Sequence, residues 1–266
     1  MKQLKIESMD LNIENDFFII GGAGSGFGNA VSKALASEGA RVLAISRTES
    51  KLTELRNLFP ENIEVLAGDL TSSNVLKEIA SLASGQKLTG TFFNAGGPPA
   101  GTFDEISMNQ WDDAYQSVVR WKIELTKLLM PQFKEQGYGR LLFLESVSVK
   151  QPVENLILSN SLRSAMIGFV KTLSQEIAQH NITANILAPG FHNTAAIQRL
   201  ITKKAEQTGK SEKEIKSQFT KDVPVGSMGN PDDLASLAVW LLSPHSRYIT
   251  GQTITHDGGL TKGLFG

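Results

Sequence analysis

The chain has 266 residues, and its 26 lysines and arginines nearly balance 27 aspartates and glutamates, giving a net charge of −1. This balance argues against a protein that binds nucleic acid or an anionic membrane through bulk charge. The absence of cysteine excludes disulfides, thiolate metal sites and cysteine nucleophiles. No apolar run approaches the ~20 residues of a membrane span, and the start lacks the layout of a signal peptide. We therefore expect a soluble, cytoplasmic protein.

Short runs rich in β-branched and aromatic residues recur along the chain, at residues 17–20, 41–46, 63–67, 91–93, 141–145, 183–187 and 253–255. They are continuously apolar, which is typical of strands buried on both faces of a parallel sheet. The stretches between them have helical periodicity, as residues 162–177 illustrate. This alternation predicts an α/β fold, a doubly wound Rossmann sheet of about seven parallel strands with helices on both faces. No linker divides the chain, so we expect one domain over residues 1–266.

The longest interval between predicted strands runs from Pro189 to about Gly251. It contains two predicted helical segments, 195–219 and 232–242, separated by a turn-rich segment. We expect residues 194–222 to form a helical lid over a substrate site, because long insertions after a strand often carry function. Their seven basic residues against four acidic ones are interpreted as a solvated helix face.

A glycine-rich loop, Gly21 to Gly28, follows the first predicted strand and opens a helix. Glycines let the backbone turn tightly and approach a pyrophosphate, and a helix N-terminus offers free N–H groups. The spacing of Gly22, Gly26 and Gly28 is GxxxGxG. Its place between strand and helix predicts a dinucleotide-binding loop.

The second predicted strand ends at Ser46 and Arg47. An acidic residue here would bind the ribose 2′-hydroxyl of NAD and repel a 2′-phosphate. A hydroxyl beside a guanidinium suits the phosphate instead, so NADP(H) is favoured over NAD(H). The alternative is that Arg47 is an ordinary surface arginine.

From about Asp10 onward the sequence resembles the short-chain dehydrogenase/reductase family. Besides the glycine loop, the resemblance is carried by Asp69-Leu70, Asn94-Ala95-Gly96 and a PGxxxT element formed by Pro189, Gly190 and Thr194. Residues 223–235 and 250–259 resemble the closing segments of 3-oxoacyl-acyl-carrier-protein reductases. The resemblance implies that the cofactor is bound by Gly22, Ser25, Gly26, Phe27, Gly28, Ser46, Arg47, Asp69, Leu70, Asn94, Ala95, Gly96, Arg163, Pro189, Gly190, His192 and Thr194.

The resemblance also implies a catalytic set of Asn, Ser, Tyr and Lys, from which this chain departs. Alignment of residues 158–168 places Ser159 at the tyrosine and Arg163 at the lysine. Ser146, thirteen residues earlier, stands at the serine, and Val118 stands at the asparagine. Arg163 can retain the positive charge and the ribose contact, but a guanidinium stays protonated in proteins and cannot shuttle protons.

Two sources of the reaction proton remain open. A water molecule held by Ser146, Ser159 and Arg163 is one. His192, with an ordinary pKa near 6.5, is the other, unless only its backbone contacts the cofactor. The predicted catalytic residues are therefore Ser146, Ser159, Arg163 and His192. The resemblance also implies that Ser148 and Lys150 face the substrate. His180, His192, His245 and His256 lack metal-ligand spacing, and no metal is expected.

The predicted function is that of an NADP(H)-dependent oxidoreductase acting on a small-molecule carbonyl or hydroxyl substrate, with a 3-oxoacyl thioester as one candidate. The alternative is a dinucleotide-binding protein without turnover, either a cofactor sensor or a partner subunit, because three of four catalytic groups differ. A lyase or epimerase is a third possibility. The resemblance implies a homodimer or homotetramer, formed through helices at residues 109–133 and 155–178. Neither nucleic acid nor membrane is expected as a partner.

Overall fold

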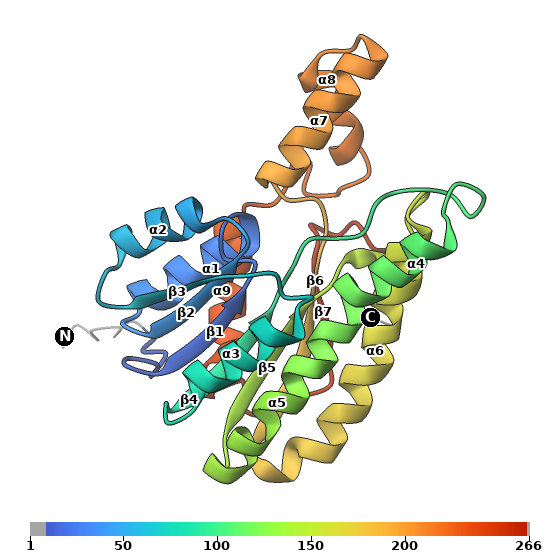
Figure 1. Ribbon diagram of the computed structural model, residues 1–266. Helices are drawn as coiled ribbons and strands as arrows, with labels where there is room; N and C mark the ends of the chain where they lie inside the picture. Colours follow the sequence, from blue (N-terminus) through green and yellow to red (C-terminus); the bar gives the residue numbers. More distant parts are fainter. Residues whose placement is uncertain (1–8, 265–266) are drawn as a thin grey trace, which may run out of the picture.

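The computed structural model describes residues 9–264 and contains one seven-stranded sheet (Figure 1). All adjacent strands are parallel, and their order is β3-β2-β1-β4-β5-β6-β7. Four of the seven are buried along their whole length, as expected for the strands of a parallel sheet that is covered on both faces. The predicted doubly wound fold is confirmed. The strands are β1 (Phe17–Gly21), β2 (Arg41–Ser46), β3 (Ile63–Ala67), β4 (Leu88–Phe93), β5 (Gly139–Leu144), β6 (Ile182–Pro189) and β7 (Thr253–His256).

Helices cover both faces of this sheet and enclose two separate cores. Alternate residues of β1 supply them: Phe17 and Ile19 enter one core, and Phe18 and Ile20 enter the other. The first core is covered by α3 (Ser73–Ala83), α5 (Trp121–Gln136) and α6 (Ile157–Ile177). The second is covered by α1 (Gly26–Ser37), α2 (Glu49–Leu58) and α9 (Pro231–Leu242). Within residues 9–264, no helix is both long and apolar enough to cross a membrane.

The helix preceding β5 is irregular in its middle. It begins as α4 (Met108–Tyr115), passes through a π-helical turn, η1 (Gln116–Arg120), and continues as α5. Such turns insert one extra residue into a helix and are frequent near functional sites. The indole Nε1 of Trp121 donates a hydrogen bond to the Ser117 carbonyl at 2.9 Å. Short 3₁₀ turns lie at η2 (Val147–Val149), η3 (Ala178–His180) and η4 (Pro244–Ser246).

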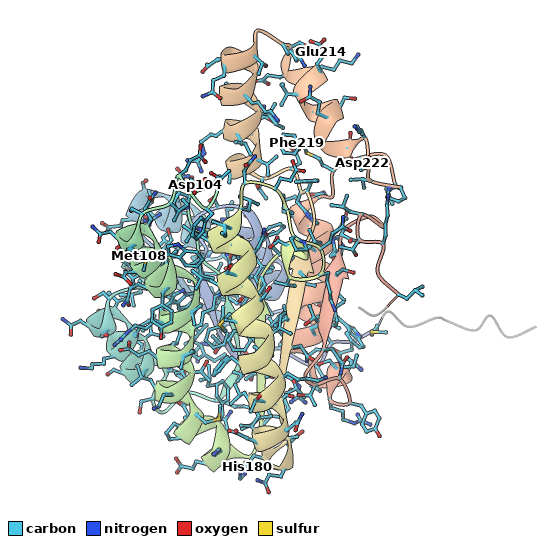
Figure 2. The ribbon with its side chains drawn as sticks, turned by 90° about the vertical axis from the view of Figure 1, so that its right-hand side faces the viewer. Asp104, Met108, His180, Glu214, Phe219 and Asp222 are labelled. Atoms are coloured by element: carbon cyan, nitrogen blue, oxygen red, sulfur yellow. The ribbon has the colours of Figure 1, made fainter. Side chains whose placement is uncertain are left out.

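The predicted helical segment 195–219 is wrong in one respect, because two helices occupy it. They are α7 (Ala195–Thr208) and α8 (Glu212–Thr220), separated at Gly209, whose φ of 67° is left-handed. Ser211 then caps α8 in a reciprocal capping box with Glu214. The two helices project from the body as an arm (Figure 1), and Glu214 at its tip lies at the opposite end of the molecule from His180 (Figure 2).

Two glycines allow the effect of backbone conformation on stability to be distinguished from the effect of the space available to a side chain. Gly137 ends α5 with φ 64°, Gly168 lies within α6, and neither has an atom within 4 Å of the position that a Cβ would take. Gly137→Ala should lower the free energy of unfolding by about 1–2 kcal/mol, because the left-handed conformation disfavours a Cβ. Gly168→Ala, the matched control, should raise it by about 1 kcal/mol. Urea unfolding measures both, and equal effects would contradict the conformational explanation.

Candidate cofactor cleft and active site

A cleft of about 580 Å³ lies at the carboxyl ends of the central strands. It spans the point between β1 and β4 where the strand order reverses, which is where ligands bind in open α/β sheets. Most of the predicted cofactor residues line it, namely Gly22, Ser25, Gly26, Phe27, Ser46, Arg47, Asp69, Leu70, Asn94, Ala95, Gly96, Arg163 and Thr194. Gly28, Pro189, Gly190 and His192 are not among its lining residues.

The glycine loop is shaped to receive a diphosphate. Gly22 and Gly26 have φ values of 63° and 58°, and Asn94 Nδ2 holds the loop by donating to the Gly21 carbonyl at 3.1 Å. Gly28 abuts the carbonyl of Gly22 and leaves no room for a Cβ. The first turn of α1 has neither a side-chain cap nor an acidic residue. Its free N–H groups therefore suit a bound anion.

Positive side chains gather at the end of the cleft formed by β2 and α2. Arg47 and Lys51 both line it, while Ser46 Oγ accepts a hydrogen bond from the Thr48 amide at 3.2 Å. Lys51 was not predicted from the sequence, although it lies about one helical turn after Arg47. Asp69 lines the same region, and the hydrogen bond from the Thr71 amide lowers the pKa of its carboxyl.

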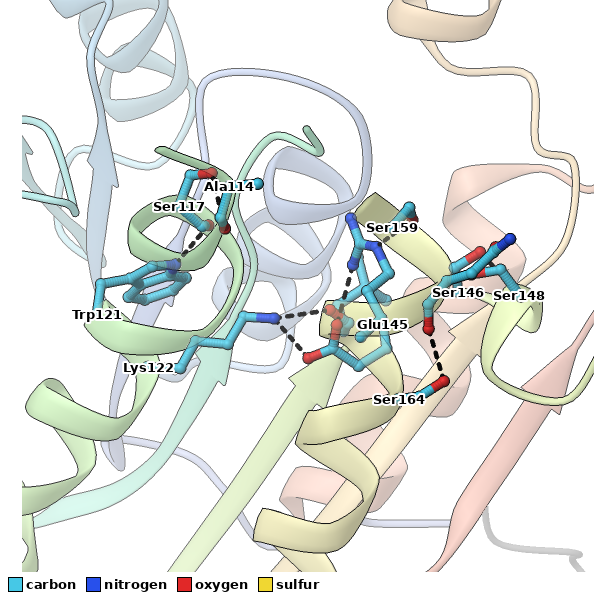
Figure 3. Close-up of polar contacts among 12 residues, drawn as sticks. Ala114, Ser117, Trp121, Lys122, Glu145, Ser146, Ser148, Ser159 and Ser164 are labelled. Carbon is cyan, nitrogen blue, oxygen red and sulfur yellow. Dashed lines mark hydrogen bonds and ion pairs between the residues drawn. The ribbon is translucent and has the colours of Figure 1, made fainter. Parts of the chain in front are cut away.

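The opposite end of the cleft is built on a buried ion cluster (Figure 3). Glu145 follows β5 directly, and its side chain has no solvent exposure. Lys122 Nζ of α5 lies 2.5 Å from Glu145 Oε1, and Arg163 Nη1 of α6 lies 3.0 Å from Oε2. Arg163 Nε donates to Ser159 Oγ at 3.1 Å. Glu145 and Arg163 line the cleft, whereas Lys122 lies behind them.

Burial has the largest effect on the charge of Lys122. It lowers the pKa of Lys122, which the Glu145 carboxylate opposes and the nearby Arg163 cation reinforces. Removal of one member of such a buried group leaves an uncompensated charge and typically costs about 3–5 kcal/mol. Neither Glu145 nor Lys122 was predicted from the sequence. The only signal was an acidic residue where a buried strand meets Ser146.

The predicted substrate residues Ser148 and Lys150 lie outside the lining of the cleft, and so do the predicted catalytic residues Ser146 and Ser159. Ser146 Oγ accepts a hydrogen bond from the Ser148 amide at 3.2 Å. The Ser148 hydroxyl oxygen is buried without a hydrogen-bond partner among the described residues. Burial, assisted by Lys171, lowers the pKa of the half-buried Lys150. Val118 is buried within the π-helical turn and contributes no polar group.

His192 is enclosed rather than directed into the cleft. Its Nδ1 lies 3.1 Å from the Gly190 carbonyl oxygen, and its Nε2 lies 2.8 Å from Nδ1 of His256. The edge of its ring meets Phe27 with the centroids 5.1 Å apart. Burial lowers the pKa of His192, which keeps the ring neutral near pH 7. The prediction that His192 donates the reaction proton therefore finds no support in its placement.

Comparison with known proteins agrees with the fold and shows the family. The family model described as Enoyl-(Acyl carrier protein) reductase, a short-chain dehydrogenase/reductase family, matches residues 22–261. The chain therefore belongs to the short-chain dehydrogenases/reductases, a family of oxidoreductases that bind a nicotinamide dinucleotide.

Three relatives illustrate the range of similar proteins. The NADPH-dependent reductase BacG of Bacillus subtilis is 27% identical, over 91% of this chain and 96% of the relative. The 3-oxoacyl-[acyl-carrier-protein] reductase FabG of Vibrio cholerae is 26% identical, over 94% and 99%. The structure of L-sorbose reductase from Gluconobacter frateurii, solved with NADPH and L-sorbose, has a TM-score of 0.91 and 25% identity, over 96% of this chain and 100% of that chain.

The lowered pKa of His192 predicts a pH-dependent contribution to stability. Below the unfolded pKa of about 6.5, the unfolded chain binds a proton that the folded protein excludes, so the contribution is lost as the pH falls. His192→Gln should be less stable than the unmodified protein at about pH 8. This stability gap should narrow as the pH falls below about 6.5. Urea unfolding across this range measures the gap, and a constant gap would contradict the prediction.

Proposed function

We propose that the protein is an NADP(H)-dependent oxidoreductase that reduces the carbonyl group of a small-molecule substrate. The observation that carries this proposal is the division of one cleft between two kinds of site. One end holds the cations Arg47 and Lys51, and the other holds Arg163, whose Nε donates to the hydroxyl of Ser159, a buried residue outside the lining of the cleft. The first suits a phosphate, and the second suits the oxygen of a carbonyl compound.

The preference for NADP(H) rests on charge. Arg47 and Lys51 can neutralise a 2′-phosphate, while Ser46 lacks the carboxylate that would bind a free 2′-hydroxyl and repel the phosphate. BacG, named as NADPH-dependent, and the NADPH-bound L-sorbose reductase support the same preference. When bound, the cofactor would supply the hydride. The glycine loop and α1 would hold its diphosphate through backbone N–H groups.

The proton must come from a group other than a tyrosine. Because Arg163 Nε donates to Ser159 Oγ, the Ser159 hydroxyl hydrogen remains free to bond to a substrate oxygen. A serine hydroxyl is a weak acid, so Ser159 orients and stabilises rather than protonates. We assign the proton to a water molecule held by Ser146, Ser159 and Arg163. Without a positioned general acid, turnover should be about 10²–10⁴-fold slower than with one.

The substrate class is narrowed by the relatives and the surrounding loops. FabG, named as a 3-oxoacyl-[acyl-carrier-protein] reductase, and the closing segments of the chain support a 3-oxoacyl thioester. The L-sorbose reductase supports a keto sugar as the second candidate. Ser148, whose buried hydroxyl has no partner among the described residues, is assigned with Lys150 to the substrate side.

The surrounding architecture fits a lidded, self-associating enzyme. Ala195, Ala196 and Arg199 of α7 line the cleft, which supports residues 194–222 as a lid within a single domain over residues 1–266.

We assign a homodimer or homotetramer to the α4–α5 and α6 surfaces, where Tyr115 is 44% exposed. A cytoplasmic location suits the cysteine-free chain.

Arg47→Glu tests the cofactor preference. It removes a partner of the 2′-phosphate and adds repulsion, so the Kd for NADPH should rise by at least about tenfold more than the Kd for NADH. Arg56→Glu is the matched control, because Arg56 is exposed on α2 outside the cleft. Fluorescence titration measures both constants, and equal losses for the two cofactors would overturn the preference.

NADPH oxidation at high enzyme concentration tests the activity itself. Ketones, keto sugars and 3-oxoacyl thioesters form the substrate panel. We expect slow, reproducible turnover that falls by no more than about tenfold in Ser159→Ala, because only a hydrogen bond is lost. A fall of about 10³-fold or more would make Ser159 the general acid. NADPH binding without turnover on any substrate would favour the non-catalytic dinucleotide-binding protein.

A further inference from the structure

The guanidinium of Arg163 is fixed by two contacts that determine its plane as well as its position. Nε donates to Ser159 Oγ at 3.1 Å, and Nη1 donates to Glu145 Oε2 at 3.0 Å. Nη2 has no hydrogen-bond partner among the described residues and lies against Gly97, where an added Cβ would be 3.2 Å away. Because a guanidinium is planar, two anchored nitrogens determine where the third one points.

Lys122 determines which carboxylate oxygen of Glu145 is available to Arg163. Its Nζ lies 2.5 Å from Oε1 and 3.5 Å from the Leu144 carbonyl oxygen, so Lys122 holds the carboxylate from behind. Oε2 is thereby presented to Arg163 on the cleft side. A buried carboxylate requires such partners on both oxygens, because an unpaired lone pair in a low-dielectric interior costs about 1–3 kcal/mol or more.

We propose that Glu145 is the positioning residue of this site. Supported by Lys122, it holds Arg163 as a rigid clamp whose Nη2 binds the nicotinamide half of the cofactor. The tyrosine and lysine that the family pattern implies are absent from this chain. In their place, the buried ion cluster would orient the nicotinamide half of the cofactor. The inference rests on the proposed function in one respect, that the cleft binds NADP(H).

The strand order assigns the clamp to the nicotinamide half. Arg47 follows β2, whereas Glu145 follows β5, and β1 and β4 lie between these strands. The ends of β2 and β5 are therefore separated by three strand spacings of about 4.8 Å each, or roughly 14 Å. A dinucleotide bound across the reversal point extends from one half of the sheet to the other. If the 2′-phosphate of NADP(H) binds at Arg47, the nicotinamide half of the cofactor lies toward Arg163.

The affinities for two ligands distinguish a positioning role of Glu145 from a general role in supporting the fold. NADPH would extend along the whole cleft, whereas 2′,5′-ADP carries only the adenosine half with its 2′- and 5′-phosphates. Glu145→Gln should raise the Kd for NADPH by about tenfold or more and leave the Kd for 2′,5′-ADP within about twofold. Glu124→Gln is the matched control, because it removes a carboxylate of α5 that is paired with Arg120 on the surface. The control should change neither constant.

Glu145→Gln alone leaves two buried cations unbalanced and can fail to fold, whereas the Arg163→Ala/Glu145→Gln double variant removes one charge of each sign and leaves only Lys122 unpaired. Chemical rescue therefore keeps the proposal testable. Arg163→Ala should bind NADPH weakly, and added guanidinium at non-denaturing concentration should restore much of the affinity relative to sodium at equal ionic strength. The Arg163→Ala/Glu145→Gln double variant should not respond. Arg163→Lys should remain weak, because one ammonium nitrogen cannot span Ser159, Glu145 and the cleft at once.

Three results would overturn the positioning role. These are an unchanged NADPH affinity in Glu145→Gln, equal weakening of NADPH and 2′,5′-ADP, and guanidinium rescue that is as large in the double variant as in Arg163→Ala. The proposed function fails separately. If the unmodified protein binds NADPH and passes these tests but reduces no carbonyl compound, then the clamp is supported and the reductase activity is not.

Discussion

The buried negative charge of Glu145 is the constraint on which the active-site end depends. It lies between Lys122 and Arg163, so a carboxylate that follows β5 joins α5 to α6 across one face of the sheet. Each of the three charges would be costly alone in this interior; Glu145 compensates both cations, and they in turn compensate Glu145. The position of both helices against β5 is therefore coupled to the shape of the site.

Under the proposed function, the two ends of the cleft differ in how far they depart from the family pattern. The glycine loop, Asn94 and the uncapped N-terminus of α1 are the elements that we propose to bind the dinucleotide. At the other end, our alignment places Ser159 and Arg163 at the tyrosine and lysine positions, where fixed charge and hydrogen bonding would take the place of acid–base chemistry. A group that stabilises an oxyanion can assist a reduction without transferring a proton itself.

The parts of the molecule that could be predicted from the sequence are those with local signatures. The apolar runs located all seven strands, and the glycine spacing located the tight turn between β1 and α1, because burial and tight turns constrain neighbouring residues. The break at Gly209 was missed because an isolated glycine does not always end a helix. The Glu145 cluster was missed for a different reason. Its partners are 23 and 18 residues away, and no local pattern distinguishes a buried ion cluster from separate surface charges.

The π-helical turn η1 has a consequence for moving this site into another protein. Each residue of a regular α-helix advances the helix by about 100°, so removing the extra residue of the turn would rotate everything after Arg120 by that angle. Lys122 would then leave the side of α5 that meets Glu145. Grafting Lys122, Glu145 and Arg163 onto a scaffold with a straight helix would transfer the three side chains but not the geometry that brings them into contact. The inserted residue is as much a component of the ion cluster as its three charges.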